Sequence, residues 1–296
     1  MLNKEIRNRR EKYIVDKASK WVFLISALIA LLSLFIIIAF VFYRGLTPFI
    51  KDGYSFIDFI VGAEWFPSSD KFGIMSMIVA SILGTGGAVI IGVPIGLLTA
   101  IFIAEVSKRN ISKIIIPAVE LLAGIPSVLY GVFGLAVIVP NIQKVFNLPK
   151  GQSLMAVIIV LAIMMLPTVI SVSVTAIKGV PDSYKEASLA LGASKIETTF
   201  KVVVPAAKSG ILAAIMLGVG RAIGETMAII LIAGNSAFLP KSIFDSVRPL
   251  TSNIALEMGY AFGTHQDMLF ATGVVLFIFI IILNLVISKL SSKEGR

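Results

Sequence analysis

Cysteine is absent from the 296 residues, and histidine occurs once, at position 265. Disulfides, thiolate metal sites and cysteine nucleophiles are therefore excluded, as is any metal site built from several histidines. Charged residues make up only 15% of the chain. The sequence also lacks the Gly-x-x-x-x-Gly-Lys-Ser/Thr loop that cradles ATP phosphates, so we expect no ATP site on this chain.

Hydrophobic residues dominate what is present, at 57% of the chain with a mean hydropathy of +0.96. A composition this apolar excludes an ordinary soluble domain. Six apolar runs reach or approach the ~20 residues that a helix needs to cross the hydrocarbon core. The sequence therefore predicts an all-α membrane protein of six transmembrane helices, at 21–43, 73–104, 114–139, 153–176, 209–234 and 267–288.

The basic residues are distributed unevenly between the two sides that these spans define. With the N-terminus in the cytoplasm, 18 of the 26 Lys and Arg residues lie on the cytoplasmic side, seven lie outside, and Arg221 lies within a span. This asymmetry follows the positive-inside rule. The net charge of +9 thus indicates topology and membrane lipid rather than a nucleic-acid partner. We expect both termini to be cytoplasmic.

The same pattern divides the chain into four parts. We predict a basic cytoplasmic tail at 1–20, a first transmembrane helix and external loop at 21–72, a core of five helices at 73–290, and a cytoplasmic C-terminal tail at 291–296. The first span is too long for the apolar region of a signal peptide, so we interpret it as a retained anchor.

A polar stretch at 182–205 interrupts the core between the fourth and fifth spans, on the cytoplasmic side. Ser183 and Glu186 have capping-box spacing, and the same spacing recurs at Ser194 and Glu197. Gly192 between them is a natural helix stop, and a proline follows at 205, where the next span should begin. The pattern predicts a helical hairpin. It is either an ordinary interfacial turn or a docking element for a soluble partner.

Arg221 and Glu225 are predicted to lie near the middle of the fifth span. At i, i+4 they would share one helix face. A charge at that depth is costly unless it is paired or hydrated, so such residues face a bundle interior or a pathway. One interpretation is an ion pair that fixes helix packing. The other is that Arg221 attracts an anion that Glu225 orients or partly neutralises, with Gly220 and Gly224 leaving room beside them.

Other polar residues in the spans have less distinctive settings. Ser127 follows Pro126, and it either satisfies the carbonyl that the proline frees or faces a pathway. Asn235 either caps the outer end of the fifth span or lies at the mouth of the pathway. His265 is expected on the external surface. The glycines at 84–87 and 218–220 lie within apolar spans, so we interpret them as helix-packing contacts rather than a nucleotide loop.

Several of these stretches resemble known transport proteins. Glu186, Ala187 and Ser188, followed by Gly192 and a Val-Pro pair at 204–205, resemble the EAA loop of ABC-importer permeases, with Ser188 in place of the second Ala. Residues 220–228 (Gly-Arg-Ala-Ile-Gly-Glu-Thr-Met-Ala) and 120–131 (Glu-Leu-Leu-Ala-Gly-Ile-Pro-Ser-Val-Leu-Tyr-Gly) resemble phosphate-importer permeases of the Pst system. Residues 250–259 resemble the PstC branch more than the PstA branch.

The resemblance implies a type I ABC-importer permease fold and a role as a transport subunit rather than an enzyme. The implied partners are a PstA-like permease, a PstB-like ATPase dimer that holds ATP and Mg, and an external PstS-like phosphate-binding protein. No cofactor is expected on this chain, and the implied location is a bacterial or archaeal cell membrane. The pathway residues would be Arg221, Glu225, Thr226, Ser127 and Asn235, and the coupling residues those of the EAA-like stretch with Gly192.

Three alternatives remain open from the residues. The substrate could be another oxyanion. The chain could be a proton-coupled secondary transporter in which Glu225 carries the proton. It could also be a scaffold without transport activity, in which Arg221 and Glu225 only pack.

Overall fold

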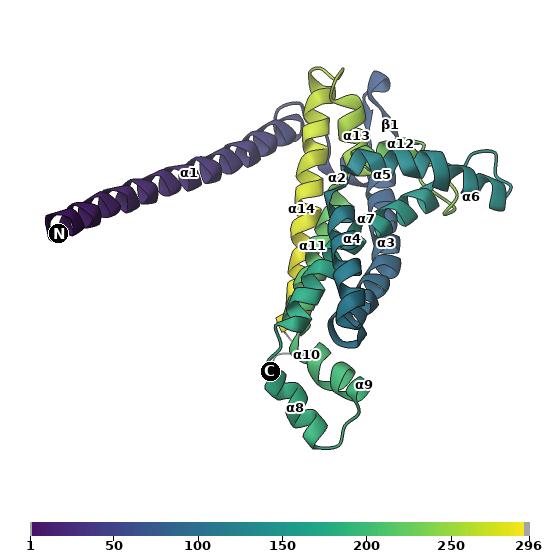
Figure 1. The fold of residues 1–296 in the computed structure, drawn as a ribbon. Coiled ribbons are helices and arrows are strands. Elements are labelled where there is room, and N and C mark those ends of the chain that lie inside the picture. Colours follow the sequence, from purple (N-terminus) through teal and green to yellow (C-terminus); the bar gives the residue numbers. More distant parts are fainter. Residues whose placement is uncertain (1, 293–296) are drawn as a thin grey trace.

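The computed structural model describes residues 2–292 and is mostly helical, which confirms the predicted fold class (Figure 1). Within that range the strands form one two-residue hairpin, with Trp65 paired to Phe72 and Phe66 to Lys71. The strands are β1 Trp65–Phe66 and β2 Lys71–Phe72, and the helices are α1 Leu2–Ile50, α2 Phe56–Val61, α3 Met75–Ile101, α4 Arg109–Gly124, α5 Ser127–Phe133, α6 Val139–Val145, α7 Leu154–Lys178, α8 Asp182–Ala190, α9 Lys195–Thr198, α10 Val204–Ala206, α11 Lys208–Gly224, α12 Met227–Ile232, α13 Leu250–Glu257 and α14 Thr264–Ser292.

Helix α7 lies at the centre of the bundle, between α3 and α11 (Figure 1). Glycines bring both neighbours close to it. A Cβ added at Gly96 of α3 would meet Val169 of α7 at 2.9 Å, and one added at Gly218 of α11 would meet the same valine at 2.8 Å. Gly84 of α3 likewise faces α7, so the packing role expected for Gly84 and Gly218 is confirmed. A Cβ added at Gly86 or Gly220 would meet no atom within 4 Å, so the packing interpretation is wrong for these two glycines.

Five helical segments of the described chain are long and apolar enough to cross a membrane, at 15–50, 75–106, 127–145, 154–178 and 264–286. A sixth is obtained when the pair 195–206 and 208–224, bent by 70°, is taken as one span. The first helix runs unbroken to Ile50, so the predicted boundary at 43 is too early. The side chains of 1–12 and residues 293–296, which include most of the predicted basic tails, lie outside the described part.

Helix α1 joins the bundle through its C-terminal end and otherwise projects away from it (Figure 1). Gly45 permits this contact, because a Cβ there would meet the backbone of Phe270 and Ala271 in α14 at 2.9 Å. Arg44 pairs with Asp267 at 2.5 Å and lies over the Phe270 ring. Helix α1 is therefore fixed at its C-terminal end, while its apolar length is exposed.

Two predicted spans are broken. The span expected at 114–139 is interrupted between α4 and α5, at Ile125 and Pro126. Pro126 supplies no N–H and disfavours helical geometry at the residue before it, which explains the break. The span expected at 209–234 is interrupted between α11 and α12, at Glu225 and Thr226. Here a glycine at 224 weakens the helix, and contacts described below hold the broken geometry.

The polar hairpin lies at the same end of the molecule as the C-terminus of α14 (Figure 1). Gly192 takes a left-handed conformation with φ of +86°, and Ser194 and Glu197 form the predicted capping box. The box predicted at Ser183 and Glu186 is wrong. Pro181 serves as the N-cap, so α8 begins at Asp182 and Ser183 falls inside the helix, where its hydroxyl cannot cap.

Candidate functional site

The two helix breaks lie side by side in the structure. Helix α5 and the π-helical turn Gly134–Ile138 that continues it pack closely on α12. A Cβ at Gly131 would meet Ala228 Cα at 2.7 Å, and one at Gly134 would meet Ile232 at 2.9 Å. These contacts advance together along both helices, so the helices run in the same direction. One turn back from Gly131 is Ser127, which places the start of α5 beside the break before α12.

The break at Ile125 and Pro126 is stabilised by a tyrosine. A proline at 126 removes the bond that Leu122 O would receive in a continuous helix. The Tyr130 hydroxyl donates to that oxygen instead, at 2.7 Å. Ser127 was one candidate for this role, and the structure assigns it to Tyr130. Ser127 itself is half-buried at the start of α5.

Glu225 holds the second break and does not share a helix face with Arg221, because α11 ends at Gly224. The Glu225 side chain is buried, and its Oε1 accepts a hydrogen bond from Ala228 N at 3.1 Å. Its backbone oxygen accepts one from Thr251 Oγ1 at 2.9 Å. Among residues 2–292 no ion pair joins Glu225 to Arg221. The prediction that the two residues share a helix face at i, i+4 is therefore wrong, because the helix ends one residue before Glu225.

Arg221 lies in the last turn of α11, half-buried and within electrostatic range of Tyr130. Its side chain makes no hydrogen bond or ion pair within the described part of the chain. A Cβ added at Gly220 or Gly224 would meet no atom within 4 Å. Thr226 turns its hydroxyl back to the oxygen of Gly224, at 3.2 Å. Arg221 therefore lies in the helical turn before the break, where Gly220 and Gly224 leave open space beside the helix.

Asn235 lies at the other end of α12, away from the break. Its Nδ2 donates to Ile230 O at 2.8 Å, which confirms the capping role as one of the two alternatives. Its backbone has φ of +58°, and its carbonyl accepts a hydrogen bond from Arg248 Nε at 2.9 Å. The structure thus brings Arg221, Glu225, Thr226 and Ser127 together and places Asn235 apart from them.

The hairpin presents an exposed surface made of α8, the Gly192 turn and α9. Glu186 and Ala187 are exposed, whereas Ser188 faces inward and shares a 2.9 Å hydrogen bond with Thr198 across the hairpin. Apolar side chains are exposed beside them, with Leu191 at the tip 90% exposed. The other exposed apolar residues of this surface are Tyr184, Leu189, Ile196 and Phe200.

One ion pair connects the hairpin to the bundle. Lys185 Nζ of α8 lies 2.8 Å from Glu105 Oε1, and both side chains are largely buried. Glu105 lies in the π-helical turn Phe102–Val106 that continues α3. Lys185 therefore links α8 directly to the end of α3.

Comparison with known proteins identifies the class of protein to which this arrangement belongs. Residues 92–293 match the family described as binding-protein-dependent transport system inner membrane component. The chain belongs to this family of ABC-importer permeases. Such permeases are transport subunits in the inner membrane, and they work with a separate ATPase subunit and a substrate-binding protein.

Relatives of the permease match most of its length. It is 37% identical to the probable ABC transporter permease protein YqgH of Bacillus subtilis over 98% of this chain and 95% of that one. It is 35% identical to the phosphate transport system permease protein PstC of Haemophilus influenzae over 80% of this chain and 83% of that one. PstC of Pasteurella multocida is 31% identical over 98% of this chain and 97% of that protein.

Solved structures share the fold at low sequence identity. A bacterial ABC transporter involved in alginate import aligns with a TM-score of 0.67 and 14% identity, over 95% of the permease and 98% of that chain. The inward-facing MetNI methionine ABC transporter aligns with a TM-score of 0.56 and 18% identity, over 76% of the permease and 95% of that chain. At these identities the likeness concerns the fold alone.

Sequence reasoning missed two residues of this site. The Tyr130 hydroxyl donates a hydrogen bond to Leu122 O at the first break, and the Thr251 hydroxyl donates one to Glu225 O at the second. Pro126 was a local signal for the first break, and a buried tyrosine one turn downstream is a suitable donor for the oxygen it frees. Thr251 gave no local signal, because it lies 26 residues from Glu225.

Proposed function

We propose that this permease carries inorganic phosphate into the cell, driven by ATP hydrolysis on a separate ATPase dimer. Its partners would be a PstA-like second permease, a PstB-like ATPase pair that holds ATP and Mg, and an external PstS-like binding protein. Relatives named PstC that are at least 30% identical support the choice of phosphate. The observation that carries the proposal is Arg221, which lies at a helix break without an acidic partner in the described chain.

The energetics favour an anion beside Arg221. A guanidinium within the membrane is costly unless another group compensates its charge. Glu225 does not pair with it, since that carboxylate accepts the Ala228 amide instead. The planar guanidinium fork binds two oxyanion oxygens at once, which suits phosphate or another tetrahedral oxyanion. The open face at Gly220 and Gly224 gives such an anion room to reach Arg221.

The hairpin would couple this pathway to the ATPase. Its exposed apolar residues around Leu191 and Ile196 suit burial in a pocket of a soluble partner. Closure of the ATPases would then move α8, and the Lys185–Glu105 ion pair would pass that motion to α3. On this proposal Glu186, Ala187, Ser188 and Gly192 form the coupling surface, and both chain termini lie in the cytoplasm with it.

Measurements of uptake and assembly test the role of Arg221. In proteoliposomes that hold the full complex, Arg221→Ala should abolish uptake of radiolabelled phosphate while the partner subunits still co-purify. Arg221→Lys keeps the charge but loses the bidentate fork, so it should also transport poorly. If Arg221 were only a packing partner, the double change Arg221→Met with Glu225→Gln would restore both assembly and uptake, and restored uptake would remove Arg221 from the mechanism.

Two controls separate the proposal from its alternatives. Unlabelled sulfate should not compete with labelled phosphate, and strong competition would indicate a general oxyanion permease. Uptake that follows a proton gradient without the ATPase would indicate proton coupling through Glu225.

The orientation of the permease in the membrane can be tested with single introduced cysteines, because the chain has no cysteine of its own. A cysteine at exposed Lys195 should be protected from an impermeant thiol reagent in intact cells, and one at exposed Lys144 should react.

A further inference from the structure

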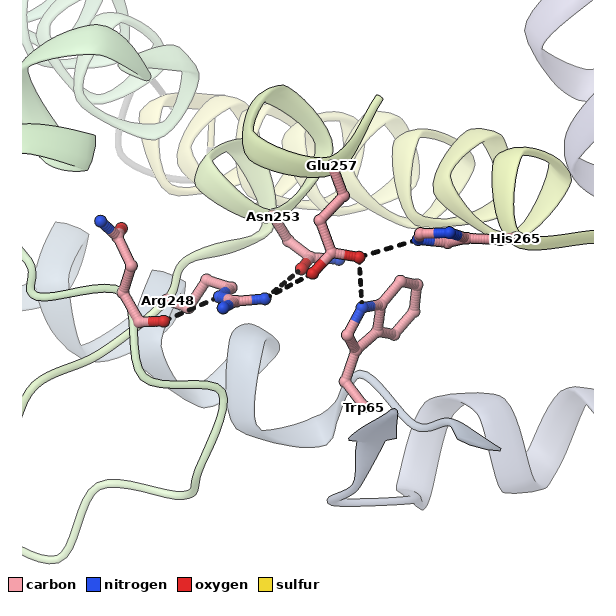
Figure 2. A network of polar contacts seen from close by, with 6 residues as sticks. Trp65, Arg248, Asn253, Glu257 and His265 are labelled. Carbon is pink, nitrogen blue, oxygen red and sulfur yellow. Dashed lines mark hydrogen bonds and ion pairs between the residues drawn. The ribbon is translucent and has the colours of Figure 1, made fainter. Parts of the chain in front are cut away.

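A buried carboxylate (Figure 2) organises the end of the permease opposite the hairpin (Figure 1). Glu257, the last residue of α13, is 6% exposed. Its Oε2 accepts a hydrogen bond from Trp65 Nε1 at 2.8 Å and lies 2.8 Å from His265 Nε2, while Oε1 accepts from Arg248 Nη1 at 2.7 Å. His265 was expected on the surface, and it is largely buried here. One carboxylate thus ties together β1, α14 and the loop before α13.

Arg248 extends this network to the outer end of α12. Its Nε donates to the carbonyl of Asn235, three residues after the end of α12. The residue before it, Val247, donates its backbone N–H to Ala233 O at 2.9 Å. The Ser246 hydroxyl donates to the same oxygen at 3.1 Å. The C-terminal end of α12 is therefore held by the segment that leads into α13.

The other end of α12 is held by α13 itself. Thr251, in the first turn of α13, donates its hydroxyl to the carbonyl of Glu225, just before α12. Thr251 and Glu257 lie on the same helix of eight residues. By contrast, the helical hydrogen-bond ladder between α11 and α12 is interrupted at Glu225 and Thr226. At the far end of α12, Ile232 O also accepts a hydrogen bond from Ser153 N, next to the start of α7, at 3.2 Å. The hydrogen bonds that α12 makes outside its own helix therefore connect it mainly to the end of the permease opposite the hairpin.

We propose that Arg248, Thr251 and Glu257 form an outer clamp that makes α12 move with β1, α13 and the start of α14. The break at Glu225 and Thr226 is then the hinge between this outer unit and α11. The three residues are positioning residues that do not touch the substrate. The proposal rests on the proposed function only in taking the break to lie on the transport pathway. On this proposal, the hydrogen bonds of Arg248, Thr251 and Glu257 determine the position of α12 relative to α11 at the break.

The buried carboxylate gives the clamp its strength. Hydrogen bonds to a charged group are shorter and stronger than neutral ones, and losing one buried partner leaves the others unsatisfied. Changing Glu257 to Gln keeps the side-chain shape but replaces the charged acceptor with a neutral amide. The amide has one acceptor oxygen where the carboxylate has two, so the bond from either Arg248 or Trp65 is lost and the other weakens. The outer end of α12 then loses its fixed position.

Distance measurements in the assembled complex test the clamp. Spin labels on the exposed residues Met227 and Phe262 report the position of α12 relative to the outer end. A second pair, on Leu217 of α11 and Phe262, reports motion across the break. In the parent complex the first distance should stay constant between the resting and nucleotide-trapped states while the second changes. In Glu257→Gln the first distribution should broaden, and phosphate uptake should fall by roughly tenfold.

Control variants show whether the broadening is specific to the bonds that hold α12. Asp267→Asn breaks the Arg44 ion pair at the same end without touching α12, so it should leave the Met227–Phe262 distribution narrow. Should Glu257→Gln fail to assemble, Thr251→Val removes the bond at the other end of α12 and should broaden the same distribution. Thr272→Val is its control, because that buried hydroxyl bonds only Met268 O within α14.

The clamp is refuted if the Met227–Phe262 distribution stays narrow in both Glu257→Gln and Thr251→Val. It is equally refuted if, in the parent complex, this distance changes on nucleotide trapping as much as the Leu217–Phe262 distance does. These distances do not depend on which substrate is carried. A failure of phosphate as the substrate would therefore leave the distance results intact, and a failure of the clamp would leave phosphate uptake by the parent intact.

Discussion

Gly131 should be the most size-sensitive position at the paired breaks. It lies in α5 where that helix crosses α12, and a Cβ there would meet Ala228 Cα at 2.7 Å, Leu231 Cδ1 at 2.9 Å and Ala228 O at 3.1 Å. Two of these atoms belong to the backbone, so they cannot move aside by a rotamer change. Gly131→Ala must therefore separate α5 from α12.

The expected change in the free energy of unfolding is the difference between a gain and a loss. Alanine in place of a helical glycine stabilises a helix by ~0.5–1 kcal/mol through backbone entropy. Overpacking against a fixed neighbour costs ~1–3 kcal/mol. The close backbone contact favours the upper part of that cost, so we expect a net loss of ~1–2 kcal/mol. At roughly 2–4 °C per kcal/mol, the midpoint of thermal unfolding should fall by roughly 2–8 °C.

The assay compares Gly131→Ala with Gly220→Ala in the purified permease, by the fraction of monodisperse protein that survives heating. Gly220 meets no atom within 4 Å, so its alanine variant should be as stable as the parent or more so. That variant should still lower uptake in the full complex, since it narrows the open face beside Arg221. If Gly131→Ala proves as stable as Gly220→Ala, the close contact between α5 and α12 is wrong, and the adjacency of the two breaks fails with it.

Three further predictions concern the hairpin. Glu186→Lys or Gly192→Glu should leave the complex assembled but remove ATP hydrolysis stimulated by the binding protein, because one alters the docking surface and the other strains a residue at φ of +86°; normal stimulation in both would exclude the hairpin from coupling. Lys185→Glu should uncouple hydrolysis from uptake and Glu105→Lys should restore it in the double variant, whereas an additive loss would show that the pair does not transmit motion. Hydrogen bonds from Ser194 lower the pKa of Glu197, so its contribution to the α9 cap is present above the ordinary Glu pKa and is lost as pH falls through the lowered value; amide exchange over 195–198 should accelerate only below that ordinary pKa.

Local chemistry was sufficient for much of this protein. The apolar runs placed the membrane segments because a helix must be both long and apolar to cross a bilayer. Gly192 and the box at Ser194 and Glu197 were predictable because a turn and a cap depend on atoms only a few residues apart. The misplaced box at Ser183 marks the limit of spacing alone, since Pro181 moved the helix start.

The break in the fifth span was decided by a contact that is distant in sequence. The fifth span reads as one apolar run, and nothing adjacent to Glu225 indicates that its carbonyl will bond Thr251 rather than continue the helix ladder. The buried setting of His265 likewise depends on Glu257 and Trp65, which come from separate elements. A buried backbone or charged group needs a hydrogen-bond partner that replaces the water it has lost, and only the tertiary structure determines which partner is near.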